Sequence, residues 1–442
     1  MEKAQHIHGE IARMGLLETD VFVGTALVDM YVKAGFLAKA QEVFDKLPAP
    51  NVVSWNALIG GYAEYGHGDK AIHLFEKMQL KSVSPDAVTF ICTLKACGVI
   101  GAIHRGQEIH SEAIQKGFEN DNFIANTLID MYVKCKLVTD ARSVFGNLSH
   151  RDIMSWTSII TGYVGYGLCD EALQFLYEMQ TEGLTPDVIT WSAIIQGYSE
   201  RKESEKVFFL FSQMQEQSII PNIVTLMSIM SICGHSAALE AGKRVHAEAQ
   251  YIGKGVMDVN VATSLIEMYG RCGSMVEAQH LFEEMVDRDL MGWNALIAGY
   301  AREGSIKPVF NLLCKMMDEG KTPDEMTFLN MYVVCNHGGL VGVGRSCFEA
   351  ISKEYGGVAT TEHYNCMIDL FSRAGQFYET LRIFQEMPFQ HDLVSWITLL
   401  SACTKWGYLE IGKKAFELVV ELYRDNGAAY ILMSNVFMDG EE

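Results

Sequence analysis

The chain has 442 residues, of which 49% are hydrophobic, and its formal net charge is −20 at pH 7. This hydrophobic content argues against general disorder, and the negative charge argues against non-specific binding to nucleic acid or to an anionic membrane surface. The length corresponds to two to four globular domains or to one solenoid. The longest uncharged runs, 153–169 and 222–239, are shorter than the ~20 apolar residues of a spanning helix. We therefore expect neither a membrane nor DNA as a partner.

The amino-terminal stretch MEKAQHIHGEIARMG is amphipathic but carries Glu2 and Glu10, which is unlike a targeting peptide. It matches the second half of the repeat unit described below. Residues 1–20 are therefore interpreted as a partial long repeat, and the chain is expected to begin inside a longer protein.

An internal repeat dominates the rest of the sequence. The stretch SWNALIGGYAEYG at 54–66 returns 238 residues later as GWNALIAGYAREG, and weaker copies lie at 155–167 and 190–202. Units begin directly after an acidic or amide residue, in motifs such as SPD, TPD, RD and PN. This rule gives eleven units of 31 to 36 residues, namely 21–51, 52–86, 87–121, 122–152, 153–187, 188–222, 223–258, 259–289, 290–324, 325–360 and 361–392.

Each unit is predicted to form two helices. In 52–86 the first helix places apolar residues near the spacing of one helix face, at Val53, Trp55, Leu58, Ile59 and Tyr62. Gly66 ends that helix, and a second apolar stretch follows. Because a lone helical hairpin leaves one apolar face bare, neighbouring hairpins must stack. The predicted fold is therefore an all-α solenoid of stacked helix-turn-helix repeats.

Two further residue types, tryptophan and cysteine, recur with the period of the repeat. Tryptophan recurs at the fourth position, where a packing wedge between helices is favoured over a stacking role, at Trp55, Trp156, Trp191, Trp293 and Trp396. The eleven cysteines contain no CxxC pair. They are interpreted as reduced core residues, and no metal site or cofactor is expected.

Small polar residues recur at the fifth position of every short and standard unit, at Thr25, Asn56, Asn126, Thr157, Ser192, Thr263, Asn294 and Asn365. The last positions of the same units hold Asn51, Asp86, Asp152, Asp187, Asn222, Asp289, Asp324 and Asp392. Helix capping explains the last positions, but it does not explain polar side chains at the fifth amid apolar neighbours. Second positions are mostly apolar, as at Val53, Met154, Ile189 and Met291, and the long units have Ile91, Met227 and Leu329 at the fifth.

The standard unit, VVSWNALIGGYAEYGHGDKAIHLFEKM…PD, resembles the pentatricopeptide repeat. A short form, NTLIDMYVKCKLVTDARSVF…RD, and a longer form, VTFICTLKAC…GQEIHSEAIQKGF, also occur. This mixture resembles the plant subclass that alternates long, short and standard repeats (PLS). Residues 393–442 resemble the carboxy-terminal E extension of plant organelle RNA-editing factors, which here stops part-way through its second unit.

The resemblance implies a right-handed α-solenoid that binds single-stranded RNA with one base per repeat. It implies that the fifth and last residues read the base, while apolar second residues sandwich it and long units act as spacers. By the family's code, Thr or Ser with Asn reads adenine, Thr with Asp reads guanine, and Asn with Asp prefers uracil. Ionised Asp only accepts hydrogen bonds, as guanine's two donors require, and an Asn amide matches the donor beside an acceptor of adenine. The predicted target is A-U-n-U-G-A-n-G-U-n-U from its 5′ end.

Catalysis is not expected. The motifs HGE, HSE and HAE, which begin at His8, His110 and His246, match the H-x-E half of a zinc deaminase, but no P-C-x-x-C follows. Their recurrence at one repeat position favours a scaffold role. The resemblance then implies target recognition for C-to-U editing in a mitochondrion or chloroplast, with a cytidine deaminase supplied by another protein. Two alternatives stay open: an α-solenoid scaffold for proteins or peptides, which the net charge mildly favours, and an RNA stability or processing factor.

Overall fold

The computed structural model describes residues 2–15, 20–118, 121–253, 258–353, 359–423 and 427–439, and every regular element in these ranges is an α-helix. The chain divides into two compact halves, Met1–Thr225 and Leu226–Glu442, each a stack of helical hairpins. The prediction of an all-α solenoid is confirmed. Some residues of five predicted units lie outside the described ranges, and these units are 1–20, 87–121, 223–258, 325–360 and 393–442.

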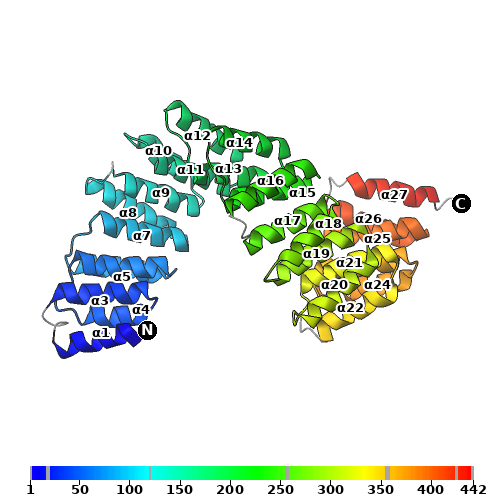
Figure 1. The fold of residues 1–442 in the computed structure, drawn as a ribbon, viewed down its shortest axis with the longest axis horizontal. Coiled ribbons are helices and arrows are strands. Elements are labelled where there is room, and N and C mark those ends of the chain that lie inside the picture. Colours follow the sequence, from blue (N-terminus) through cyan, green and yellow to red (C-terminus); the bar gives the residue numbers. More distant parts are fainter. Residues whose placement is uncertain are drawn as a thin grey trace. The chain divides into compact units, whose positions relative to one another are not determined.

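In the amino-terminal half, the first helices of successive units lie side by side (Figure 1). They are α3 (Val21–Lys33), α5 (Val52–Glu64), α7 (Ala87–Ile100), α9 (Asn122–Lys134), α11 (Ile153–Gly165) and α13 (Val188–Glu200). Each packs against a second helix that follows it along the chain. These are α4 (Leu37–Asp45), α6 (Gly68–Leu80), α8 (Ile103–Gln115), α10 (Val138–Asn147), α12 (Cys169–Thr181) and α14 (Ser204–Glu216). The opening helix α1 (Glu2–Arg13) packs on α3, and α15 (Ile223–His235) begins at the border of the half.

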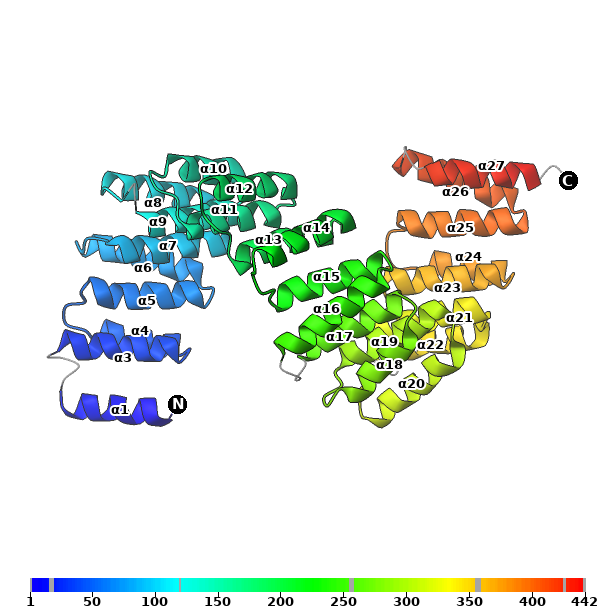
Figure 2. The ribbon, with the colours of Figure 1, turned by 45° about the horizontal axis from the view of Figure 1, so that its top comes forward.

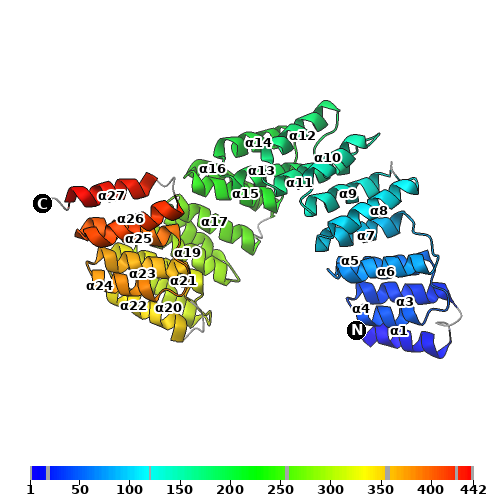
Figure 3. The same ribbon diagram turned by 180° about the vertical axis from the view of Figure 1, so that it is seen from behind.

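The carboxy-terminal half repeats this arrangement, as Figures 2 and 3 show from two further directions. Its first helices, which contact one another in sequence order, are α17 (Val259–Arg271), α19 (Leu290–Glu303), α21 (Glu325–Gly338), α23 (Thr361–Arg373), α25 (Leu393–Trp406) and α27 (Gly427–Asp439). The second helices are α16 (Leu239–Ile252), α18 (Met275–Glu284), α20 (Ile306–Asp318), α22 (Val341–Lys353), α24 (Phe377–Glu386) and α26 (Leu409–Leu422).

Tryptophan at the fourth position is a packing residue. Trp55, Trp156, Trp191 and Trp293 are at most 2% exposed. Where a shorter second helix precedes the unit, the indole meets a phenylalanine of that helix edge-on, as between Phe145 and Trp156, whose ring centroids lie 4.7 Å apart. The same pairing recurs between Phe282 and Trp293 at 4.7 Å. An edge-to-face pair of this kind adds to the stabilisation from burial, so the indole joins one hairpin to the next.

Glycine at the tenth position of a unit allows neighbouring first helices to pack closely. A β-carbon added at Gly61 would lie 2.6 Å from a methyl group of Val32, and one added at Gly162 would lie 2.5 Å from a methyl group of Val133. Each of these valines belongs to the preceding first helix. Since such distances are too short for any side chain, the glycines are required by close packing and not by a turn.

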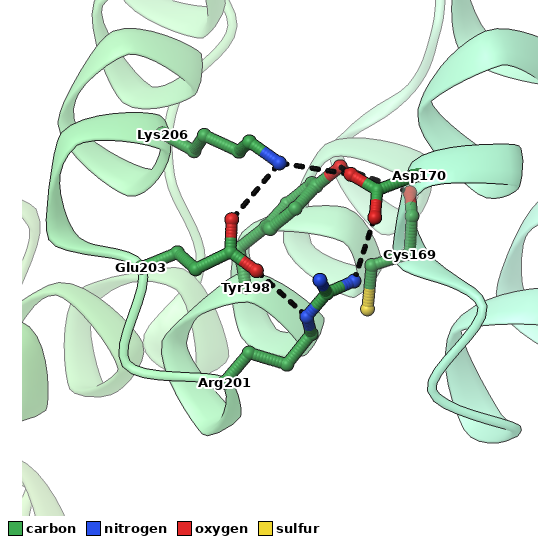
Figure 4. A network of polar contacts seen from close by, with 6 residues as sticks. All are labelled: Cys169, Asp170, Tyr198, Arg201, Glu203 and Lys206. Carbon is green, nitrogen blue, oxygen red and sulfur yellow. Dashed lines mark hydrogen bonds and ion pairs between the residues drawn. The ribbon is translucent and has the colours of Figure 1, made fainter.

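A polar network joins the two adjacent standard units 153–187 and 188–222 (Figure 4). Asp170, at the start of α12, accepts hydrogen bonds from Lys206 at 2.8 Å and from Arg201 at 3.0 Å. The same carboxylate accepts from the Tyr198 hydroxyl at 2.9 Å, and Glu203 pairs with both cations. Hydrogen bonds, the one from Lys206 foremost, hold the pKa of Asp170 well below its usual range. The charged groups of this network are partly to largely exposed, so solvent screens their interactions and the ion pairs contribute little to the free energy of unfolding.

Two sequence-based expectations need correction. Val53 was placed on the apolar face of its helix, but its side chain is 57% exposed. The next two residues, Ser54 and Trp55, are buried, so Val53 lies on a solvent-facing side of α5. All eleven cysteines are free, and most are buried or half-buried, but Cys314 is exposed.

In the described part of the chain, the helices fall short of the length and hydrophobicity needed to cross a membrane.

The glycine contacts predict that Gly162→Ala destabilises the stack. We expect a loss of roughly 1–3 kcal/mol in the free energy of unfolding, because the added methyl group forces α11 away from Val133. Gly165→Ala in the same helix is the matched control. Beyond its chain neighbours and its own helix backbone, no described atom lies within 4 Å of the β-carbon added there, so this change should be neutral or stabilise by up to about 1 kcal/mol. Thermal denaturation of both variants measures the difference, and equal melting temperatures would contradict the packing argument.

Candidate nucleic-acid interface

The last residue of each unit caps the first helix of the next. In every short and standard unit, its Oδ1 accepts the backbone N–H three residues later. The distances are 3.0 Å at Asn51, 2.9 Å at Asp86, 2.8 Å at Asp152, 2.8 Å at Asp187, 2.9 Å at Asn222, 2.8 Å at Asp289, 2.9 Å at Asp324 and 2.7 Å at Asp392. Because a backbone N–H can only donate, the atom that meets it in Asn51 and Asn222 is the amide oxygen. Helix capping is therefore one role of all eight residues.

The fifth residue of each unit lies in the first helix, five residues after the cap residue of that helix. These side chains are buried or half-buried. In three units the fifth side chain donates directly to the last residue of its own unit: Asn56 to Asp86 at 2.9 Å, Asn294 to Asp324 at 2.9 Å, and Asn365 to Asp392 at 3.4 Å. The Ser192 hydroxyl lies 3.1 Å from Asn222 Oδ1. The structure thus brings together these four predicted pairs, across about 30 residues of chain. A fifth pair is Asn126 with Asp152, since a hydrogen bond from the Asn126 side chain helps to lower the pKa of Asp152.

The other predicted pairs are arranged differently. The Thr157 hydroxyl lies 2.7 Å from that of Thr190, which itself donates to Asp187 at 2.8 Å. Within the described residues, the hydroxyls of Thr25 and Thr263 and the amide oxygen of Asn126 are buried with no hydrogen-bond partner. Thr25 with Asn51 and Thr263 with Asp289 are therefore not joined by the threonine hydroxyl. Each of these three fifth residues keeps a polar atom that no described residue satisfies.

The second residues surround these polar pairs with apolar surface. Val53, Met154, Ile189 and Met291 are 56% to 66% exposed. Phe22 and Phe123 occupy the same position in two short units and are also exposed. The fifth residues of the long units, Ile91, Met227 and Leu329, are half-buried and offer no hydrogen-bonding group. The surface therefore alternates apolar side chains with polar pairs along successive first helices.

Four aspartates of the pairs, Asp86, Asp152, Asp324 and Asp392, are held as carboxylates. Burial acts to raise the pKa of Asp86, but hydrogen bonds from Thr89 and Asn56 outweigh it and leave that pKa below its usual value. The same balance, with hydrogen bonds from Thr327 and Asn294, lowers the pKa of Asp324. The carboxyl groups of Asp152 and Asp392 follow the same pattern. These side chains can therefore only accept hydrogen bonds at neutral pH.

The sequence reasoning missed the role of the third residue in many of the first helices. Threonine or serine recurs there, as at Thr89 and Ser395, and its hydroxyl lies 2.9 Å from Asp86 and 2.7 Å from Asp392. The signal in the sequence is the hydroxyl three places after the last residue of the preceding unit. It fits a capping box, but the contacts between this hydroxyl and the fifth residue cannot be read from spacing.

The histidines of the H-x-E motifs are packing residues. His8, His110 and His246 place Nδ1 at 2.9, 2.8 and 3.0 Å from the hydroxyls of Tyr31, Tyr132 and Tyr269, which lie on the next first helix. The rings of each pair also meet edge-on. Over the described ranges, the histidine, cysteine and carboxylate side chains form no group that could hold a metal ion. The geometry gives these motifs a role in joining long units to short ones.

Two models of known protein families match the chain. The "PPR repeat family" model matches residues 50–98, 151–199 and 186–235. The "PPR repeat" model matches residues 25–49, 123–153, 261–290, 292–320 and 362–389.

Curated relatives match over nearly the whole chain. A putative pentatricopeptide repeat-containing protein of Arabidopsis thaliana is 32% identical over 98% of this chain and 57% of its own length. A mitochondrial pentatricopeptide repeat-containing protein of the same plant is 31% identical over 99% of this chain and 72% of its own length. The chain therefore belongs to the pentatricopeptide repeat family. It spans only 48% to 59% of the length of several other curated relatives.

Solved structures share the fold. The pentatricopeptide repeat protein PPR10 from maize superposes with a TM-score of 0.64 at 18% identity, over 94% of this chain and 71% of PPR10. PPR10 in complex with an 18-nt psaJ RNA element superposes with a TM-score of 0.57 at 20% identity, over 95% of this chain and 66% of PPR10.

The histidine–tyrosine contacts predict a pH-dependent stability. Burial lowers the pKa of His110, so the unfolded chain, whose histidine titrates near pH ~6.5, takes up the proton first. Stability linked to His110 is thus present above about pH 6.5 and is lost as the pH falls toward the folded pKa. His110→Gln removes the titrating group but keeps a side chain that can bond Tyr132. Between about pH 7.5 and pH 5.5, its melting temperature should fall less than that of the unaltered protein. An identical fall would contradict this role.

Proposed function

We propose that this chain binds single-stranded RNA by sequence, with one base read by the fifth and last residues of each short or standard unit. The observation that carries the proposal is the recurring polar pair, such as Asn56 with Asp86, set between exposed apolar second residues. Apolar side chains can cover the faces of a base while the pair meets its edge. Membership of the pentatricopeptide repeat family and the RNA complex of PPR10 support this function.

The capping geometry supplies a chemical reason for the code. Oδ1 of the last residue is used by the helix, so the group left for a base is Oδ2 of aspartate or Nδ2 of asparagine. An N–H donor from Asn222 complements the ring-nitrogen acceptor of adenine. A carboxylate oxygen from Asp187 complements the ring N–H of guanine, and one from Asp86 complements that of uracil. At Asp152 this second oxygen also lies 3.3 Å from Asn122, so that unit departs from the pattern.

We further propose an organellar role in C-to-U editing, with the deaminase supplied by another protein. The names of related proteins include mitochondrial and chloroplastic ones, which supports an organelle in general. The editing role rests on the resemblance of the mixed repeat lengths to the PLS subclass and of residues 393–442 to an E extension. A stability or processing factor, or a protein-binding scaffold, would share the fold and is separated from editing by the experiments below.

The sharpest test is Asn222→Asp. Aspartate caps a helix as well as asparagine does, so α15 should keep its start, but the group offered to the base changes from a donor to an acceptor. We expect the preference at the base read by Ser192 and residue 222 to move from adenine to guanine by roughly 1–3 kcal/mol. Selection from a random RNA pool, followed by binding assays on single-base variants, measures the shift.

The guanine read by Thr157 and Asp187, immediately 5′ of that base, is the internal control and should not change. Asn222→Ala is the matched structural control, since it removes both the cap and the reading group and should lower the melting temperature. If Asn222→Asp weakened binding to all RNA sequences equally, Asn222 would be a helix cap and not a base-reading residue. An unchanged adenine preference would make the repeat register, and with it the predicted target, wrong.

The editing proposal predicts that the purified chain does not deaminate RNA. Incubation with an RNA that carries the selected target and a downstream cytidine should leave that cytidine unchanged, with or without added zinc. Addition of an organelle extract that contains deaminase should convert it to uridine, and RNA with a scrambled target should stay unconverted. Conversion by this chain alone would contradict supply of the deaminase by another protein.

A further inference from the structure

A threonine from the next unit contacts the fifth residue in each of the four standard units. The hydroxyl-to-side-chain distances are 2.6 Å from Thr89 to Asn56, 2.7 Å from Thr190 to Thr157, 2.7 Å from Thr225 to Ser192, and 2.7 Å from Thr327 to Asn294. Each threonine is the third residue of the following first helix, so it lies beside the cap residue and the fifth residue at once. The predicted reading pair is in fact a cluster of three side chains.

The hydrogen bonds around Asn56 fix which of its groups remain free. Asn56 Nδ2 donates to Asp86 Oδ1 at 2.9 Å, and the same oxygen accepts the backbone N–H of Thr89. The single hydroxyl proton of Thr89 therefore goes to the closer and otherwise unused acceptor, Asn56 Oδ1, at 2.6 Å. The amide oxygen is thus consumed, and the amide keeps one N–H to offer beside the second carboxylate oxygen of Asp86.

This arrangement of one donor beside one acceptor suits uracil and disfavours cytosine. Uracil presents a carbonyl acceptor next to its ring N–H. Cytosine presents an amino donor next to a ring-nitrogen acceptor, which reverses the pattern. If Asn56 Oδ1 were free, it could accept the amino group of cytosine. The hydroxyl of Thr89 prevents this because it occupies that oxygen.

The same threonine also caps its helix, but the two roles are separable. Asp86 N–H donates to the Thr89 hydroxyl at 3.1 Å, and Asn51 N–H donates to the Ser54 hydroxyl at 3.0 Å, so both complete a capping box. Ser54 does not bond Thr25, the fifth residue of the preceding unit, whose buried hydroxyl has no hydrogen-bond partner among the described residues. The contact with the fifth residue therefore does not follow from capping. The short unit 361–392 shares it, since Ser395 donates to Asn365 Oδ1 at 2.7 Å.

We propose that Thr89, Thr190, Thr225 and Thr327 are positioning residues that set base specificity by holding the fifth side chain in one orientation. In the units of Asn56 and Asn294, they make the site select uridine over cytidine. This inference rests on the proposed function, because it assigns a third member to the same RNA-reading site.

The experiment compares Thr89→Val, Thr89→Ser and Ser54→Ala in the full chain, with RNAs that differ only at the nucleotides read by units 21–51 and 52–86. Thr89→Val keeps the shape but removes the hydroxyl, so it leaves Asn56 Oδ1 unsatisfied. The preference for uridine over cytidine at the nucleotide of unit 52–86 should fall by about tenfold, with the other nucleotides unaffected. Thr89→Ser should retain the preference.

Ser54→Ala is the matched control, since it removes the same capping bond without touching a fifth residue. It should lower the melting temperature but leave the base preference of unit 21–51 unchanged. Thr327→Val, which faces Asn294 in the other half, repeats the test if Thr89→Val fails to fold. A normal uridine preference in both valine variants, or equal weakening of uridine and cytidine RNAs, overturns this inference alone. Absence of any base preference in the unaltered protein at these nucleotides overturns the proposed function together with it.

Discussion

The hydrogen bond from a backbone N–H to the last side chain of the preceding unit is the interaction on which the rest of the architecture depends. At Asp86 it starts α7, and the same carboxylate oxygen also accepts the amide of Asn56 in α5. One oxygen therefore sets both a helix start and the position of a side chain 30 residues earlier. Sliding α5 along α7 would break the bond from Asn56, whereas the capping bond lies within α7 and would stay. For this reason the capping role and the proposed reading role of these residues do not compete.

Close packing keeps this relation constant from unit to unit. Gly61 and Gly162 let each first helix approach the valine of the helix before it, and the buried tryptophans fill the space toward the second helices. The spacing of the polar pairs along each half is thus set by rigid helix contacts rather than by the loops. Exposed ion pairs such as those of Asp170 add little to the free energy of unfolding, since water screens them. They join α12 to the two helices of the adjacent standard unit.

The proposed RNA-binding surface combines polar groups that have hydrogen-bond partners within the protein with polar groups that lack a partner among the described residues. Asn56 and Asn294 are held by two hydrogen bonds each, so their free groups have one orientation. Thr25 and Thr263 have hydroxyls with no partner among the described residues, and such buried groups gain most from a ligand that bonds them. The apolar second residues are exposed in the free protein, as patches that bind ligands commonly are. The repeats therefore offer two types of site on one scaffold, and the short unit 361–392, whose Asn365 bonds Asp392 and Ser395, shares the type seen at Asn56.

The sequence by itself determined the repeat period, the helical hairpins, the cap residues and the polar fifth positions. These features depend on residues within one helix or at its start, so local spacing is sufficient to predict them. Other features were decided by the tertiary structure. They include the exposure of Val53, the contact of Thr89 with Asn56, and the unsatisfied hydroxyl of Thr25. Ser54 and Thr89 occupy the same position in the repeat, yet only Thr89 reaches the fifth residue of the preceding unit. The physical reason is that this contact joins atoms of two different helices, so it depends on how closely neighbouring hairpins pack, and a one-dimensional pattern does not contain that distance.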